Sequence, residues 1–175
     1  MTIIIDDAGS GDLLFGVVIG AYREETEEFK YDVIDVKYFQ SRLFKRKEYL
    51  KEATRIVLSL LSKLGLKDDE RVLICRGYIF EDAVKELKSR FGESRVQTIK
   101  VVGKPQEYVE LAYLDELRNL GYEPIMDRDE KRAKSFFHML KWIEGDPDRI
   151  KYAKNGWPKL RKYRLFRKYM SSTRY

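Results

Sequence analysis

The sequence predicts an α/β domain with a mixed five-stranded sheet, flanked by helices and followed by a helical C-terminal extension. Two observations carry this prediction. Apolar, β-branched runs alternate with segments whose apolar residues recur every three or four positions, as they do in helices. The order is three strands, then helix and strand in alternation. The first three strands would pair antiparallel, and the later strands would join the sheet through helical crossovers.

The first part of the chain predicts a hairpin, a third strand and a long helix. Thr2–Asp6 and Leu13–Tyr22 are apolar runs separated by a glycine-rich turn, which is typical of a hairpin. Phe29–Phe39 alternates apolar and polar residues and is expected to form the third strand. Lys45–Leu64 has helical apolar spacing and is followed by Gly65, a residue that often ends helices.

The rest of the chain alternates strands and helices and then becomes helical. Strands are expected over Glu70–Cys75 and Val96–Val102. Helices are expected over Phe80–Phe91, Pro105–Leu120 and Ala133–Ile143, with short helices after Asp148 and Pro158. We assign the sheet domain to residues 1–125 and a basic helical extension to residues 126–175.

The composition excludes several classes of protein. Cys75 is the only cysteine and His138 the only histidine, which excludes a disulfide framework, a Cys-rich zinc module and a His-rich metal site. Cys75 lies in an apolar run and is expected to be a core residue. No apolar run reaches the ~20 residues of a membrane helix and no secretory leader is recognisable, so we expect a cytoplasmic protein without a membrane partner. Abundant Lys, Arg and Glu with scarce Asn and Gln are common in thermophile proteins.

All the excess positive charge lies at the C-terminal end. Residues 151–175 hold nine basic residues and no acidic one, and the first 150 residues carry a net charge of −3. Basic groups interleaved with aromatic rings suit binding to nucleic acid. Alternatively, a terminal helix buries its rings on the domain and leaves its cations in solvent. The residues expected to contact a substrate are Lys159, Arg161, Lys162, Arg164, Arg167 and Lys168.

The turn between the first two strands, Asp6–Asp12, contains two adjacent carboxylates and two glycines. A carboxylate pair at a strand end suits a hard divalent cation, which activates water against a phosphodiester. Glycines allow a phosphate or a sugar to approach the backbone closely. The alternative is a hairpin turn in which the Asp side chains only cap backbone N–H groups.

The run Asp6-Asp7-Ala8-Gly9-Ser10-Gly11 resembles the Asp-Glu-Ala-Gly-Arg-Gly signature of type 2 ribonucleases H. The resemblance extends over residues 1–120 and implies a ribonuclease H-like fold. It implies that Asp6 and Asp7 bind metal and that Gly9, Ser10 and Gly11 contact substrate, with Ser10 in place of the family's Arg.

The same resemblance places basic residues where two further carboxylates are expected. Arg76 stands at the third position and Lys104 at the fourth. Arg76 and Lys104 could take the place of the metals and pair with the carboxylates, or contact a phosphate directly. Alternatively, another acid completes the metal site; the candidates are Asp12, Glu48, Glu52, Glu81, Asp82, Glu107 and Glu110.

We therefore predict a ribonuclease H-like, nucleic-acid-binding protein that hydrolyses phosphodiesters with Mg²⁺ or Mn²⁺. Asp6 and Asp7 would bind the metal, and Lys104 or Arg76 would contact the scissile phosphate. One alternative is a degenerate relative that binds RNA or DNA without cutting it and needs no cofactor. Another is a non-catalytic protein-interaction module whose basic tail docks on an acidic partner.

Overall fold

The computed structural model describes residues 1–128 and 130–172 and contains the predicted mixed sheet, which confirms the fold class. The strand order is β3-β2-β1-β4-β5. β1 pairs antiparallel with β2 and parallel with β4, and β5 continues the parallel half. The strands are β1 (Thr2–Ala8), β2 (Val17–Arg23), β3 (Glu28–Ile34), β4 (Arg71–Cys75) and β5 (Val96–Ile99).

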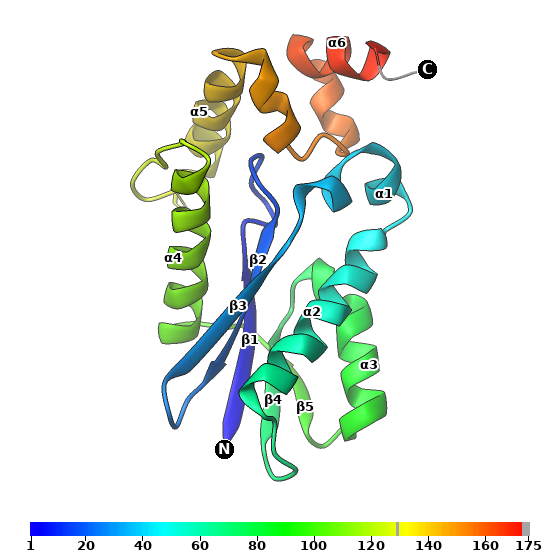
Figure 1. The fold of residues 1–175 in the computed structure, drawn as a ribbon, viewed down its shortest axis with the longest axis vertical. Coiled ribbons are helices and arrows are strands. Elements are labelled where there is room, and N and C mark those ends of the chain that lie inside the picture. The colour runs from blue at the N-terminus through cyan, green and yellow to red at the C-terminus, as the bar shows by residue number, and fades with distance from the viewer. Residues whose placement is uncertain (129, 173–175) are drawn as a thin grey trace.

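Helices cover both faces of this sheet (Figure 1). α4 packs against β1 and β2 on one face, whereas α2 and α3 pack together on the other. α5, α6 and the turns between them lie at the end where β1 terminates. The helices are α1 (Ser41–Lys45), α2 (Glu48–Leu64), α3 (Glu81–Phe91), α4 (Lys104–Asn119), α5 (Arg132–Glu144) and α6 (Arg164–Ser172). Short 3₁₀ turns span Val36–Phe39, Tyr78–Phe80, Pro147–Tyr152 and Pro158–Lys162. No described helix is long and apolar enough to cross a membrane.

Several predicted elements are longer than the observed ones. The second strand, expected from Leu13, begins only at Val17, after Phe15, whose backbone is left-handed with φ of 66°. The third strand stops at Ile34 because the Asp35 side chain accepts a hydrogen bond from the Lys37 N–H and starts a 3₁₀ turn. The long helix begins only after Lys47, which has a left-handed backbone with φ of 55°. The last strand stops at Ile99, because its pairing partner β4 ends at Cys75.

The sheet separates two apolar cores. The first lies under α2 and α3. The second lies under α4 and α5 and includes residues from the C-terminal extension: Ala153, Leu160 and Phe166 are fully buried there. The second core therefore draws residues from both sides of the predicted boundary at residue 125, and that boundary stays a prediction.

The extension is attached to the turn that follows β1. The Phe15 N–H donates to the Tyr152 carbonyl at 2.7 Å, and the Lys154 N–H donates to the Leu13 carbonyl at 2.8 Å. An isolated antiparallel bridge joins Leu14 to Ala153 between these two bonds. This pairing holds residues 13–15 of the β1–β2 connection against the extension.

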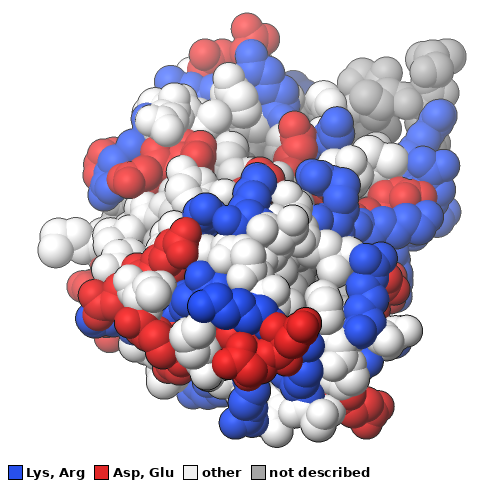
Figure 2. Space-filling view, turned by 60° about the horizontal axis from the view of Figure 1, so that its bottom comes forward, with Lys and Arg blue, Asp and Glu red and all other residues white. Residues whose placement is uncertain are grey.

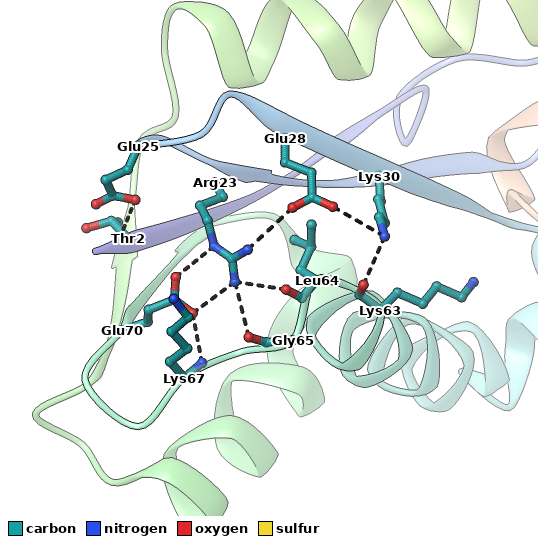
Figure 3. A network of polar contacts seen from close by, with 10 residues as sticks. All are labelled: Thr2, Arg23, Glu25, Glu28, Lys30, Lys63, Leu64, Gly65, Lys67 and Glu70. Atoms are coloured by element: carbon teal, nitrogen blue, oxygen red, sulfur yellow. Dashed lines mark hydrogen bonds and ion pairs between the residues drawn. The ribbon is translucent and has the colours of Figure 1, made fainter.

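A buried ion pair lies at the other end of β1, where α2 leads into β4 (Figure 3). The Arg23 guanidinium donates to both carboxylate oxygens of Glu70, at 2.7 and 3.0 Å, and to the Leu64 carbonyl at 2.9 Å. The Lys67 N–H donates to the same carboxylate at 2.8 Å. Glu70 is fully buried, so its charge depends on these donors.

Candidate functional site

A cleft of about 530 Å³ opens where β1 ends and the chain turns toward β2. Its wall includes the predicted turn residues Gly9, Ser10 and Gly11. Acidic side chains on the wall come from β1, the turn and α4: Asp6, Asp7, Asp12 and Glu110. Basic side chains come from segments late in the sequence: Lys100, Arg128 and Arg132. The cleft therefore places charges of both signs around the carboxylate pair.

Asp6 and Asp7 occupy the last part of β1, where the pairing with β4 has already ended at Ile5. Burial raises the pKa of Asp6, against the lowering effect of hydrogen bonds from Cys75 and the Asp7 N–H. Burial also raises the pKa of Asp7 to about 6, with a further rise from the Asp6 charge. A hydrogen bond from Ser10 and the charge of Lys154 act in the opposite direction. The pair is thus a concentrated negative charge that costs free energy in the absence of a cation.

Cys75 is the third member of this group. The last parallel pair joins Ile5 to Ile74, so Cys75 is the β4 residue that lies beside Asp6. It is half-buried, and its sulfur lies within 4.8 Å of a carboxylate oxygen of Asp6 and of Asp7. Cys75 packs against the first apolar core, as expected, and its sulfur also lies beside the two carboxylates. The alignment of two adjacent strand ends could have revealed this contact, because both strands were predicted.

Lys154 lies beneath the turn and was not among the predicted site residues. Its ammonium group is fully buried and donates to the Asp12 carbonyl at 2.8 Å and to the Leu14 carbonyl at 3.1 Å. Burial lowers the pKa of Lys154 to about 7, and the charges of Asp12 and Asp7 partly offset this. Lys154 therefore holds the turn and supplies positive charge near Asp7.

Arg128 closes one side of the cleft. Its guanidinium is buried and forms ion pairs with Asp12 and Glu110. It also lies over the ring of Tyr113, with 5.0 Å between the guanidinium carbon and the ring centre. Asp12 and Glu110 are two of the acids that were candidates to complete the metal site. Both reach the cleft, where each forms an ion pair with Arg128.

The two predicted glycines differ. Gly9 has φ of +89°, and a Cβ added there would lie 2.4 Å from the Tyr113 ring. Gly11 has no atom within 4 Å of such a Cβ, and its φ is not in the left-handed region. Gly9 therefore cannot carry a side chain in this fold, whereas Gly11 lines the cleft with open space around it, and its predicted contact with a substrate stays a prediction.

Arg76 and Lys104 are not brought to the carboxylates. Arg76 is exposed and lines a separate surface hollow beside Glu81, because successive side chains of an extended chain point to opposite faces. Lys104 is exposed at the start of α4 and pairs with Glu27 of the β2–β3 turn, not with Asp6 or Asp7. Their predicted contact with a phosphate stays a prediction.

The remaining predicted residues lie outside the cleft. Glu48 and Glu52 on α2 pair with Lys51 and Arg55, and Asp82 pairs with Lys85. Glu81 and Glu107 are exposed. The six basic residues of the extension are all exposed, namely Lys159, Arg161, Lys162, Arg164, Arg167 and Lys168. Arg174 and Tyr175 lie outside the described residues.

The donor set fits one divalent cation. Asp6, Asp7 and Cys75 each offer a ligand atom, and these atoms lie within 4.8 Å of one another. Among the described residues, no other group of three acidic, Cys or His side chains meets that criterion. The two further carboxylates on the wall are held by Arg128, which leaves fewer anionic ligands than a pair of metal ions requires.

The fold is ribonuclease H-like. The chain superimposes on the crystal structure of a point mutant of Bst-RNase HIII with a TM-score of 0.52 and 14% identity, over 99% of this chain and 70% of that one. The crystal structure of Bst-RNase HIII in complex with Mn²⁺ gives a TM-score of 0.50 with the same identity and coverage. No protein-family model and no curated protein matches the sequence.

The titration of Asp7 predicts how the metal-free protein responds to pH. Because folding raises the pKa of Asp7 from 3.8 to about 6, the folded protein retains this proton to higher pH than the unfolded chain. The free energy of unfolding should therefore fall as pH rises from about 4 to 6, by roughly 2 kcal/mol. Asp7→Asn should remove most of this fall, and urea unfolding in a chelator at several pH values would measure it. Equal pH slopes for both proteins would contradict the prediction.

Proposed function

We propose that the protein hydrolyses nucleic-acid phosphodiesters at the Asp6–Asp7 end of β1, with a divalent cation held by these two carboxylates. Mg²⁺ or Mn²⁺ is the ion that the family resemblance implies. The observation that carries the proposal is that one cleft is lined by the two carboxylates at the end of β1, by the glycine turn and by several cationic side chains. The same fold occurs in Bst-RNase HIII, one of whose structures contains Mn²⁺.

Each group in the cleft has a defined part in this proposal. The bound cation would polarise a water molecule and offset the charge of the phosphate. Asp6 and Asp7 hold that cation, and Ser10 orients Asp7 through its hydrogen bond. Lys100 and Arg132, both exposed on the wall, are placed to meet phosphate oxygens. Lys154 keeps the turn in position from below.

The exposed cations of the extension suit a longer contact with the nucleic-acid backbone. They follow α5 in the chain, and their segment lies at the end of the molecule where β1 terminates (Figure 1). The cleft is lined by residues of the same region, the turn after β1 and α5. At the opposite end, Lys and Arg are interspersed with Asp and Glu (Figure 2). Phe166 is buried and Trp157 is half-buried, so the proposed contact does not rely on bases stacking on these rings. The contact would be one with phosphates and would weaken with salt.

A second candidate function is a non-catalytic interaction module. The observation that favours it is the exposure of the six cations of the extension, which would fit an acidic protein surface as well as a phosphate backbone. In that case the Arg128 guanidinium would take the place of a metal ion beside Asp12 and Glu110.

The test combines cleavage and binding. Labelled RNA, DNA and RNA–DNA hybrid duplexes would be incubated with the full chain and Mg²⁺, Mn²⁺ or Zn²⁺ in turn. We expect metal-dependent cleavage that Asp6→Asn abolishes, while binding of the duplex persists. Arg161→Ala with Lys162→Ala should weaken binding and lower the salt slope by roughly 1–2, because log affinity changes by about 0.7–0.9 per phosphate contact.

Matched controls separate the candidates. Lys85→Ala with Arg90→Ala removes two exposed cations from α3 and should leave binding unchanged. Binding of nucleic acid without cleavage, and with no effect of Asp6→Asn, would favour a non-catalytic nucleic-acid-binding protein. Failure to bind any of these nucleic acids would favour the interaction module. If the Arg161 and Lys162 variant binds with unchanged affinity and an unchanged salt slope, the extension is not part of the proposed interface.

A further inference from the structure

The donor atoms at the end of β1 are not all oxygen. Asp6 and Asp7 supply carboxylates, and Cys75 supplies sulfur from the neighbouring strand end. Cys75 lies on the wall of the same cleft, and its sulfur is within 4.8 Å of a donor oxygen on each of the two carboxylates. Among the His, Cys, Asp and Glu side chains of the described residues, Cys75 is the one whose donor atom lies within 4.8 Å of both carboxylates.

We infer that this site binds a thiophilic divalent cation of the Zn²⁺ class through Asp6, Asp7 and Cys75, and prefers it to Mg²⁺. The inference deepens the proposed function, because it concerns the ion held at that same site. Thiolate sulfur favours zinc and related transition metals, whereas Mg²⁺ takes oxygen ligands almost exclusively. Two carboxylates and one thiolate also leave a fourth tetrahedral position for water, as in zinc sites that activate water.

The donor atoms are close enough to converge on a single ion. Zinc lies about 2.3 Å from sulfur and about 2.0–2.2 Å from oxygen, so ligands at tetrahedral angles lie roughly 3.3–3.7 Å apart. The three donor atoms are within 4.8 Å of one another, and small side-chain rotations would bring them to one ion. The other two carboxylates on the wall, Asp12 and Glu110, are paired with Arg128 and do not compete with the Cys75 sulfur for the third position.

The binding step balances in charge and atoms. The metal–sulfur bond forms as the S–H bond of Cys75 breaks, and the proton passes to solvent. Two carboxylates and one thiolate then surround one dication, which leaves a net charge of −1. The buried Lys154 ammonium, whose charge acts on Asp7, lies on the side of the turn opposite to solvent and is suited to offset that charge.

The test titrates the metal-free full chain with Zn²⁺, Co²⁺, Mg²⁺ and Mn²⁺, by calorimetry and by absorption. We expect one equivalent of Zn²⁺ or Co²⁺ to bind at least roughly tenfold more tightly than Mg²⁺. The Co²⁺ complex should show a sulfur-to-metal charge-transfer band in the near ultraviolet. Cys75→Ser should remove this band and weaken Zn²⁺ binding at least about tenfold, with Mg²⁺ binding unchanged. Cys75→Asp should shift the preference toward Mg²⁺.

His138 provides the matched control. It is the only imidazole in the chain, it is exposed and it is hydrogen-bonded to Tyr122, so His138→Ala should leave Zn²⁺ binding intact. Zn²⁺ binding that depends on His138 and not on Cys75 would overturn the inference. Tight Mg²⁺ or Mn²⁺ binding that is lost in Asp6→Asn but unaffected by Cys75→Ser would overturn it while sparing the proposed function. Zn²⁺ binding through Cys75 without cleavage of any substrate would support the inference and contradict the proposed function.

Discussion

Deletion of residues 151–175 is expected to unfold the protein, not merely to remove the proposed contact with nucleic acid. The deleted segment contributes Ala153, Leu160 and Phe166 to the second core, all fully buried. Loss of a buried Leu side chain costs about 2–5 kcal/mol and loss of a buried Phe about 3–5 kcal/mol. Together these losses are comparable to the whole stability of a domain, about 5–15 kcal/mol. Near-ultraviolet circular dichroism and thermal melting would show the loss of a cooperative native state.

Point variants test the same argument without the deletion. Phe166→Ala alone should lower the free energy of unfolding by about 3–5 kcal/mol. Lys159→Ala, next to buried Leu160 but itself exposed, should change it by no more than about 0.5 kcal/mol. A deletion variant that still melts cooperatively near the temperature of the full chain would show that the sheet and its helices are stable without the extension.

Glu70→Gln is expected to lower the free energy of unfolding by about 3–5 kcal/mol, because it leaves the buried Arg23 guanidinium without its counter-charge. Burial by itself would raise the pKa of Glu70, but the hydrogen bonds from Arg23 and the Lys67 N–H outweigh it and lower that pKa. The stabilisation should therefore be complete above the unfolded pKa of Glu, about 4.3. It should be lost as pH falls through the lower pKa of the folded state.

Two variants control for this effect, and urea unfolding would measure all of them. Glu28 contacts the same guanidinium at 3.4 Å but is well exposed, so Glu28→Gln should cost less than about 1 kcal/mol. Replacement of both partners, Arg23→Met with Glu70→Met, should recover much of the loss, since neither charge is then buried alone. Equal losses in the Glu28 and Glu70 variants would argue against burial as the source of the effect.

Local patterns were enough to predict the order of the elements and the class of the sheet. Each strand and helix can be predicted from the spacing of its own apolar residues, which is visible within a short window of sequence. The placement of Asp6 and Asp7 at the end of a strand next to a glycine turn followed from the same local reading, and β1 ends there. Element boundaries were less well predicted, because pairing partners and side-chain caps decide where strands and helices stop.

The composition of the site depended on contacts that no local pattern encodes. Lys154 meets the Asp12 carbonyl across 142 positions of sequence, and Arg128 meets Asp12 across 116. Cys75 joins the carboxylates only because β4 pairs parallel to β1 in one particular register. The sequence by itself determined the fold class and the carboxylate pair. Tertiary packing decided that Cys75, and neither Arg76 nor Lys104, lies beside that pair, because register and crossover geometry, not spacing along the chain, set which distant side chains meet.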